Sequence, residues 1–282
     1  PDQQSRREAE AEALKVFTLY DAPLYAFVLY IIREDKKGIL MKFHHLIFDG
    51  WSYTLFIDNF WENYQLLQEG HSIKHPDSPG YLAYLDAEQK YRSSHRYERN
   101  GTYWKEKFHT LAPKIINSSE SMKSRRRNFI MDSTHTLAVK RIIRDNNWTQ
   151  NTFFTTLFLI FLYKYFHETD LVIGLPTYNR TSGKMKKTIG MFTSSLPLRI
   201  TIQPELTFSG FLKQVTGEVG MCYMNQKYPY DQLAKDLELR KHNYKNLFDF
   251  CCNVFNITIP LSFNDVILET EELHTGNQLY AM

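Results

Sequence analysis

Two neighbouring segments near the start of the chain have the polarity pattern of strands, and the segment after them has the pattern of a helix. Residues 25–33 read as a strand, and residues 39–43, which are apolar except for Lys42, read as a second one. Residues 34–38 between them are mostly charged and end in glycine, which is typical of a turn. Residues 52–67 carry apolar side chains at the spacing of an amphipathic helix. This pattern predicts a strand, a turn, a second strand and then a helix.

The rest of the chain mixes helical and strand-like patterns. We expect helices over residues 81–108, 138–146, 150–167 and 207–226, and strands over residues 128–137, 170–174, 193–201 and 248–257. Residues 112–128 hold a proline, several serines and a basic run, and they read as a connection. Because the elements interleave without the short, regular rhythm of a doubly wound sheet, the fold class that we predict is α+β.

The loop between the second strand and the helix carries the most specific chemistry of the chain. It reads His44-His45-Leu46-Ile47-Phe48-Asp49-Gly50. An imidazole titrates near neutrality and can take a proton from an amine or hydroxyl that attacks a thioester. A carboxylate four residues later can hold the loop in place, and the glycine permits a tight backbone path and close approach of a substrate. Two histidines, an aspartate and a glycine at fixed spacing therefore indicate acyl transfer.

Composition and charge exclude several classes of protein. With 282 residues, of which 43% are hydrophobic, the chain can bury a large core and does not read as disordered. A net charge of +3 is too small to indicate nucleic-acid binding. The three cysteines, Cys222, Cys251 and Cys252, predict no disulfide framework. They have no zinc-ligand spacing to the two histidines, so we predict neither a metal site nor thiol catalysis.

Neither end of the chain nor its interior reads as a targeting or membrane segment. Residues 1–12 are polar and charged, which excludes a secretory signal in the sequence as it stands. The most apolar segment, residues 153–166, includes two threonines and a lysine and falls short of a membrane span. We expect a buried core helix there and a cytoplasmic enzyme domain.

Four motifs in the same order resemble condensation domains of nonribosomal peptide synthetases, which belong to the chloramphenicol-acetyltransferase-like superfamily. The first is the His-His-x-x-x-Asp-Gly loop. The other three are Gly174-Leu175-Pro176-Thr177-Tyr178-Asn179-Arg180, Ile189-Gly190-Met191-Phe192-Thr193-Ser194-Ser195-Leu196-Pro197-Leu198-Arg199, and Tyr228-Pro229-Tyr230-Asp231-Gln232-Leu233. Residues 193–195 replace the commoner Val-Asn-Thr of the family, so the asparagine of that motif has no counterpart in this chain.

The resemblance implies two chloramphenicol-acetyltransferase-like αβ lobes arranged in a V, with a substrate tunnel between them. We expect residues 1–113 to form the C-terminal part of the N-terminal lobe, residues 114–127 the connection and residues 128–282 the C-terminal lobe. Compared with the family, the chain is expected to be truncated at both ends. The motifs that precede the histidines in typical members are missing, and residues 276–282 look like a strand that breaks off.

The resemblance also implies the reaction, which is amide bond formation. A donor acyl or peptidyl thioester on one carrier protein is attacked by the amine of an aminoacyl thioester on a second carrier. Both substrates are attached to phosphopantetheine arms, and the domain itself is expected to bind no cofactor. An adenylation domain of the same assembly line is a further expected partner, and nucleic acid and membrane are not. The basic runs at residues 123–127 and 184–187 read as solvated loops, and acidic carriers are the natural candidates if these runs bind a partner.

Within this reading each motif residue receives a role. His45 is the catalytic candidate, as general base or as hydrogen-bonding positioner, and His44 supports the loop because successive residues of an extended segment point to opposite sides. The N–H of Gly50 is a candidate oxyanion donor. Asp49 is expected to form a shielded ion pair with Arg180. The candidates for lining the tunnel are Trp51, Ser52, Ser194 and Ser195.

Three other functions are considered at the level of the sequence. Related His-x-x-x-Asp acyltransferases use free coenzyme A thioesters, although the motifs around Arg180 and Arg199 argue against that class. Epimerization domains share the histidine motif, but the later motifs favour a condensation domain proper. A catalytically silent, condensation-like recruitment domain is the alternative from a different class, and the intact histidine motif argues against it.

Overall fold

The computed structural model describes residues 3–33, 36–75, 80–116, 123–255, 262–263, 266–267, 269–273 and 276. Contacts divide the chain into two compact units. The first consists of residues 1–85, 180–192 and 257–277, and the second of residues 86–179, 193–256 and 278–282. The first unit therefore contains both the His-His loop and a segment from the middle of the chain that includes Arg180.

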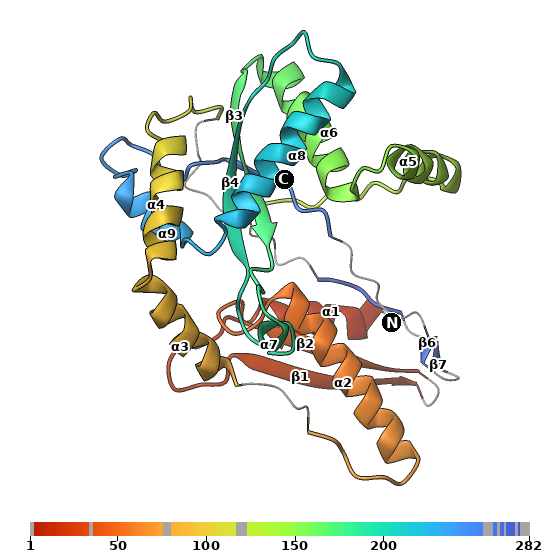
Figure 1. Cartoon of the computed structure of the whole chain (residues 1–282). Helices are drawn as coiled ribbons and strands as arrows, with labels where there is room; N and C mark the ends of the chain where they lie inside the picture. Colours follow the sequence, from red (N-terminus) through yellow and green to blue (C-terminus); the bar gives the residue numbers. More distant parts are fainter. Residues whose placement is uncertain are drawn as a thin grey trace. The chain divides into compact units, whose positions relative to one another are not determined.

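The first unit is built around an antiparallel hairpin and one long helix (Figure 1). Its elements are α1 (Gln3–Leu14), β1 (Tyr25–Arg33), β2 (Lys36–Phe43), α2 (Gly50–Gln68), the first turn of α3 (Tyr81–Arg92), α7 (Gly183–Lys186), β6 (Ser262–Phe263) and β7 (Val266–Ile267). Phe43 at the end of β2 stacks on Phe48 with ring centroids 3.9 Å apart, and Phe56 of α2 packs edge-on against Phe43. These aromatic contacts join both ends of the His-His loop to α2.

The second unit holds a three-stranded sheet and most of the helices (Figure 1). Its elements are the rest of α3, α4 (His95–Lys107), α5 (Ser133–Asp145), α6 (Gln150–Phe166), β3 (Asp170–Thr177), β4 (Ser194–Thr201), α8 (Phe208–Met224), α9 (Tyr230–Asp236) and β5 (Phe250–Cys251). The strand order is β4-β3-β5, with β4 antiparallel and β5 parallel to β3. Helices α6 and α8 pack together, and α8 also packs on β4. Mixed helix and sheet is the α+β architecture expected from the sequence.

The core of the second unit is large and apolar. It includes Leu159 and Leu162 of α6, Ile173 of β3, Leu198 of β4 and Val215 of α8, all fully buried. These residues explain why the apolar segment 153–166 is a core helix. For the described residues, no helix is long and apolar enough to span a membrane.

Polar caps explain where most of the helices begin. Side chains accept a first-turn amide at the start of six helices, from Asp49, Ser94, Asp132, Thr149, Ser182 and Thr207. Such caps satisfy N–H groups that have no partner inside the helix. They also account for two errors of the sequence interpretation.

The strand expected over residues 128–137 is wrong. Asp132 caps α5 by accepting the amide of His135 at 2.8 Å, so the chain is helical from residue 133 onwards. The helix expected over residues 81–108 is interrupted, because Ser94 caps a new helix, α4, after α3 has ended at Arg92. A capping hydrogen bond fixes these boundaries more strongly than the apolar periodicity on which the predictions rested.

Three other expectations have different outcomes. Of the strand predicted over residues 248–257, only Phe250–Cys251 pairs, and residues 256–257 lie outside the described part. The strand expected at residues 276–282 also lies outside it, apart from residue 276. The lobe boundaries at residues 113 and 128 stay a prediction, since units defined by contacts are not the same thing as lobes. Trp104 of α4 and Phe108, the C-cap residue of that helix, nevertheless lie in the core of the second unit.

Candidate functional site

The His-His loop is a tight turn between β2 and α2. The N–H of His44 donates to the carbonyl of Leu24 at 2.8 Å, and the N–H of Ile47 donates back to the carbonyl of His44 at 3.1 Å. The N–H of Leu46 donates to Nδ1 of the His44 ring at 3.1 Å. With Nδ1 acting as acceptor, neutral His44 carries its proton on Nε2. The ring is further held edge-on against Phe17, at 5.7 Å between centroids. His44 therefore has the contacts of a residue that supports the loop.

The side chain of His45 differs from that of His44 in its surroundings. Its side chain is exposed, and none of the described residues makes a hydrogen bond or ring contact with it. The turn thus presents one imidazole outward while the neighbouring imidazole is tied to the backbone. An accessible ring on an ordered turn is what proton transfer to a bound substrate requires.

Asp49 closes the turn and is almost fully buried, with 2% of its surface exposed. As the N-cap of α2, its Oδ1 accepts the N–H of Ser52 at 2.8 Å, and its carbonyl accepts the N–H of Tyr53 at 3.0 Å. Its Oδ2 accepts the N–H of Phe192, also at 3.0 Å. Nη2 of Arg180 lies 2.9 Å from Oδ1 and 3.1 Å from Oδ2. The structure thus brings together the two residues for which the sequence predicts an ion pair.

Arg180 is surrounded by oxygen atoms of its own loop. Its Nη1 donates to the carbonyls of Met185 and Thr188, both at 2.5 Å, and its Nη2 donates to Ser52 Oγ at 3.0 Å and to the Gly190 carbonyl at 3.1 Å. The guanidinium carbon lies 4.0 Å above the ring of Phe192. We call the group Asp49, Ser52, Arg180, Thr188, Gly190 and Phe192 the arginine cage. It anchors the start of α2 to the segment 180–192.

The cage determines the charge state of Asp49. Burial raises the pKa of this carboxyl, but the N–H groups of Ser52 and Phe192, the Ser52 hydroxyl and the charge of Arg180 together outweigh it, so the pKa is below its ordinary value of 3.8. Burial in turn lowers the pKa of Arg180 below its ordinary value, and the charge of Asp49 and its hydrogen bond oppose this change. Most polar atoms of this buried pair find partners, which is what two buried charges require, and among the described residues only Nε of Arg180 in the pair is buried without one.

Two of the residues predicted to line a tunnel make hydrogen bonds within the first unit. Ser52 is fully buried; its Oγ donates to the Gly190 carbonyl at 2.8 Å and accepts the Gly190 N–H at 2.9 Å. The prediction that Ser52 lines a tunnel is therefore corrected, because its hydroxyl is part of the cage. Trp51 is half-buried, and its indole Nε1 donates to the Lys186 carbonyl at 2.9 Å, which ties the first turn of α2 to α7.

The other predicted site residues lie at the starts of a helix and a strand. Gly50 is the first residue of α2, at the positive end of the helix dipole, and its role as oxyanion donor stays a prediction. Ser194 and Ser195 begin β4 in the second unit, paired with Thr177 and Pro176 of β3, and both are half-buried. Their role in lining a tunnel also stays a prediction.

The remaining motif residues of the second unit have structural contacts. Arg199 Nη2 lies 2.7 Å from Asp170 Oδ2, which joins the ends of β3 and β4. Asp231 is exposed in the first turn of α9 and lies 3.8 Å from Lys235. The N-cap of α9 is Pro229, and no side chain caps this helix.

The sequence interpretation missed contacts inside the arginine cage and next to it. The carbonyls of Met185 and Thr188 carry no sequence signal, because every residue has a carbonyl. Tyr81 of α3, whose hydroxyl donates to the Met191 carbonyl at 2.6 Å, lies in none of the motifs. Gly190 and Phe192 were inside a motif that we recognised, but only the structure shows that they contact Ser52 and Asp49.

Replacing Gly190 by alanine tests how closely the cage is packed. A Cβ at residue 190 would lie 2.2 Å from Cδ2 of Tyr81. We expect Gly190→Ala to reduce the free energy of unfolding by about 1–3 kcal/mol through overpacking. Gly183→Ala in the same segment is the matched control, because nothing lies within 4 Å of a Cβ there. Denaturant unfolding measures both variants, and equal stabilities would show that the cage is loosely packed.

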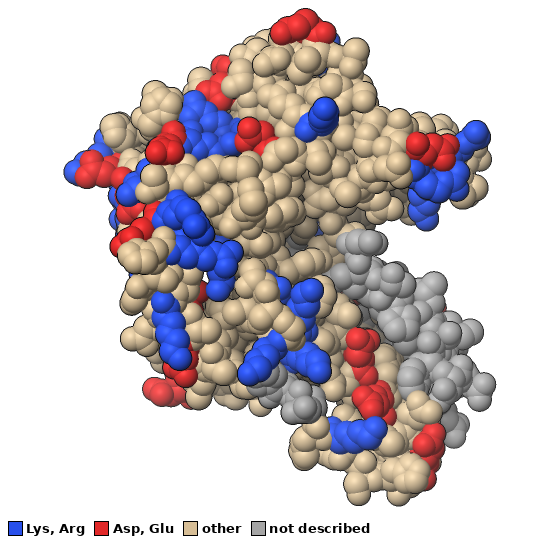
Figure 2. All heavy atoms as spheres, in the orientation of Figure 1, with Lys and Arg blue, Asp and Glu red and all other residues tan. Residues whose placement is uncertain are grey.

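Positive charge gathers on α7 beside the cage. Lys184 and Lys186 belong to this short helix and Lys187 follows it, and Figure 2 shows blue side chains at the place that α7 occupies in Figure 1. Since Trp51 donates to the Lys186 carbonyl, these lysines are connected to the start of α2 through one hydrogen bond. The other basic run, at residues 123–127, lies in the second unit.

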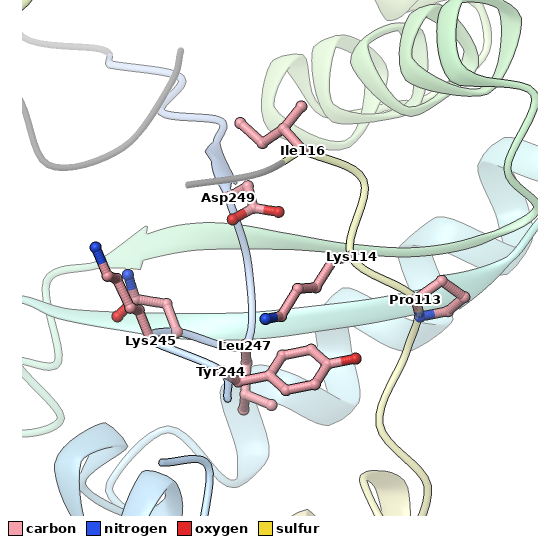
Figure 3. Close-up of a pocket in the computed structure, with 8 residues that line it drawn as sticks. Pro113, Lys114, Ile116, Tyr244, Lys245, Leu247 and Asp249 are labelled. Carbon is pink, nitrogen blue, oxygen red and sulfur yellow. The ribbon is translucent and has the colours of Figure 1, made fainter. Parts of the chain in front are cut away.

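A small pocket in the second unit is separate from these motifs (Figure 3). Lys114 reaches over the ring of Tyr244 at 4.6 Å and donates to the Asn243 carbonyl. Burial raises the pKa of Asp249, and the N–H groups of Ile115 and Ile116 oppose this change. These contacts fasten residues 112–116 to the segment before β5.

In the part of the chain that the structure describes, no group of His, Cys, Asp and Glu side chains is suited to hold a metal ion.

The chain is similar to parts of known peptide synthetases. It is 29% identical to surfactin synthase subunit 1 of Bacillus subtilis (strain 168) over 274 residues, which are 95% of this chain and 8% of the synthase. It is 27% identical to bacitracin synthase 3 of Bacillus licheniformis over 254 residues, which are 87% of this chain and 4% of that synthase. The chain thus corresponds to a small part of these relatives.

Solved structures share the fold. The first condensation domain of the calcium-dependent antibiotic synthetase, in complex with a substrate analogue, superposes with a TM-score of 0.84 at 18% identity, over 99% of this chain and 62% of that one. A variant of the starter condensation domain of rhizomide synthetase, in complex with C8-CoA, gives a TM-score of 0.72 at 22% identity, over 89% of this chain and 58% of that one. The sequence profile of the condensation domain matches residues 1–278. The chain belongs to the condensation domain family, whose members in nonribosomal peptide synthetases are amide-forming acyltransferases.

Proposed function

We propose that this chain joins a donor acyl or peptidyl thioester to the amine of an acceptor aminoacyl thioester, with both substrates held on carrier proteins of a nonribosomal peptide synthetase. The observation that carries the proposal is the exposed His45 ring on a turn whose last residue, Asp49, is bound in the arginine cage. Family membership supports it. The carriers and an adenylation domain would be parts of the same assembly line, and the cytoplasm would be its compartment.

The proposed chemistry uses few groups of the protein. The amine nitrogen attacks the thioester carbonyl carbon, a carbon–nitrogen bond forms, the carbon–sulfur bond breaks and the thiolate leaves. His45 either accepts the proton that the amine loses or donates a hydrogen bond that positions the reacting groups. The N–H of Gly50, at the start of α2, would stabilise the oxyanion of the intermediate. Holding both thioesters in reacting position contributes on the order of 7–11 kcal/mol.

A second candidate is acyl transfer from a free coenzyme A thioester. The related starter condensation domain in complex with C8-CoA favours it, because that domain has the same fold. Only the donor would differ, since the amine acceptor and the role of His45 would be the same.

The source of the donor decides between these functions. We expect amide product when two separately loaded carrier proteins are mixed with the chain, and at least about tenfold less when the donor is the matching acyl-coenzyme A. Mass spectrometry of the acceptor carrier measures the product. Efficient turnover with acyl-coenzyme A would favour the second candidate, and no product from either donor would favour a recruitment domain.

The same assay tests whether the lysines of α7 meet the acidic carriers. The rate should fall as sodium chloride is raised from 50 to about 500 mM, because salt screens exposed charges. Lys184→Glu combined with Lys186→Glu should weaken this salt dependence and raise KM. Lys140→Glu combined with Arg144→Glu on α5, which changes as many charges elsewhere, is the matched control. Equal effects of the two double variants would exclude α7 as the contact.

A further inference from the structure

Tyr81 lies against the segment that closes the arginine cage. Its hydroxyl donates to the Met191 carbonyl at 2.6 Å, and its ring covers Gly190 so closely that a Cβ there would clash. The ring also meets Phe192 edge-on, with centroids 5.3 Å apart and planes at 84°. Tyr81 begins α3, and both α3's first turn and residues 180–192 belong to the first unit.

The backbone of each of the three consecutive residues 190–192 makes a hydrogen bond with a different side chain. Gly190 bonds to Ser52 Oγ through both its N–H and its carbonyl, and the Phe192 N–H donates to Asp49 Oδ2. The carbonyl of Met191, between them, accepts the Tyr81 hydroxyl. Ser52 and Asp49 belong to the start of α2 and Tyr81 to α3, and the Gly190 carbonyl also accepts Nη2 of Arg180.

This segment controls the position of Asp49 and hence of the His-His loop. Asp49 receives the Phe192 N–H on one carboxylate oxygen and the Ser52 N–H on the other. It stands four residues after His45, at the end of a turn whose other end is fixed to Leu24. A shift of residues 190–192 would therefore move Asp49 and, through the short turn, the His45 ring.

We propose that Tyr81 is a positioning residue for amide formation, acting from α3 through the Met191 carbonyl and Asp49 to aim the His45 ring. This inference rests on the proposed function, since it names a residue that supports the same site. Because the contact is one hydrogen bond on a segment with other anchors, its loss displaces the loop without unfolding the unit.

Tyr81→Phe is the test, because it keeps the ring on Gly190 and removes only the hydroxyl. We expect kcat to fall about tenfold, since small misplacements of a reacting group have effects of this size, while KM stays within about twofold. The ring-proton NMR resonance of His45, assigned by its absence in His45→Ala, should shift or broaden. Tyr64→Phe is the matched control: it also removes a hydrogen-bonded hydroxyl from the first unit, but on α2 near Gln68, away from the cage.

Two results would overturn the inference. One is a Tyr81→Phe variant with the kcat of the unmodified chain, and the other is a loss of rate and of melting temperature without a change in the His45 resonance, which would indicate a purely structural role. The resonance also separates this inference from the proposed function. Should the unmodified chain form no amide, the proposed function fails, while a shift of the His45 resonance in Tyr81→Phe would still support positioning and an unchanged resonance would overturn it.

Discussion

His45→Ala is expected to lower the rate of amide formation by about 10²–10⁴-fold, the usual contribution of a general acid or base. The fold should survive, because the His45 side chain is exposed and has no hydrogen-bond partner among the described residues. The measurement is product formation with two loaded carriers, next to a thermal unfolding curve. His71→Ala is the matched control, because that histidine is an exposed loop residue of the same unit.

His45→Gln separates the two roles left open for this residue. A glutamine amide can donate a hydrogen bond but cannot accept a proton as a base. A rate above about a tenth of the original would favour the positioning role, and a rate equal to that of His45→Ala would favour the general base. Full activity of His45→Ala would show that neither role applies.

The second large effect is expected for the ion pair of the arginine cage. Asp49→Asn should reduce the free energy of unfolding by about 3–5 kcal/mol, because it leaves the buried guanidinium of Arg180 without its counter-ion. The side chains of Arg180 and Asp49 are only 1% and 0% exposed, so water cannot take over the lost interaction. Such a loss is a large share of the roughly 5–15 kcal/mol that a folded domain has. Urea unfolding measures it.

Asp231→Asn is the control for this prediction. Asp231 forms a pair with Lys235 whose side chains are both 71% exposed, so its loss should leave the unfolding midpoint unchanged. An Asp49→Asn variant as stable as the control would show that the cage does not depend on the charge of Asp49. Loss of activity with unchanged stability would instead give Asp49 a direct role in the reaction.

The pH dependence of stability gives a second measurement of the same cage. The folded-state pKa of Asp49 lies below 3.8, so the unfolded chain binds a proton at this site more readily than the folded chain. The stabilisation is therefore fully present above the pKa of the unfolded chain and is lost as the pH falls through the folded-state pKa. The stability difference between the original chain and Asp49→Asn should persist above about pH 4 and shrink at lower pH.

The local pattern of apolar and polar residues was sufficient to predict the helices and strands whose pattern lies within one segment of the sequence. The apolar run at residues 39–43 and the helical spacing at residues 52–67 predicted β2 and α2, and with them a strand-to-helix loop for the two histidines. The residues around position 130 show the limit. They look β-prone, but one cap at Asp132 makes the following residues helical, and Phe129 and Ile130 are 88% and 96% exposed.

Some residues of the candidate site were also predictable from the sequence, and others were not. The motif and the family resemblance together singled out His45, Asp49 and Arg180, although Arg180 lies 131 residues away from Asp49 in the sequence. They did not indicate that Ser52 is buried in the cage, because an amphipathic pattern says which face of α2 is apolar and not what meets its first turn.

The sequence by itself determined the fold class, the His-His loop and its place between a strand and a helix, since these depend on side-chain period and on residues adjacent in the chain. Only the tertiary structure decided that Arg180 is held by the carbonyls of Met185 and Thr188 and that Tyr81 holds Met191. Backbone carbonyls are the same in every residue, so no sequence pattern records which of them a distant side chain will reach. That choice is made when separate segments pack together and each buried polar group must find a partner.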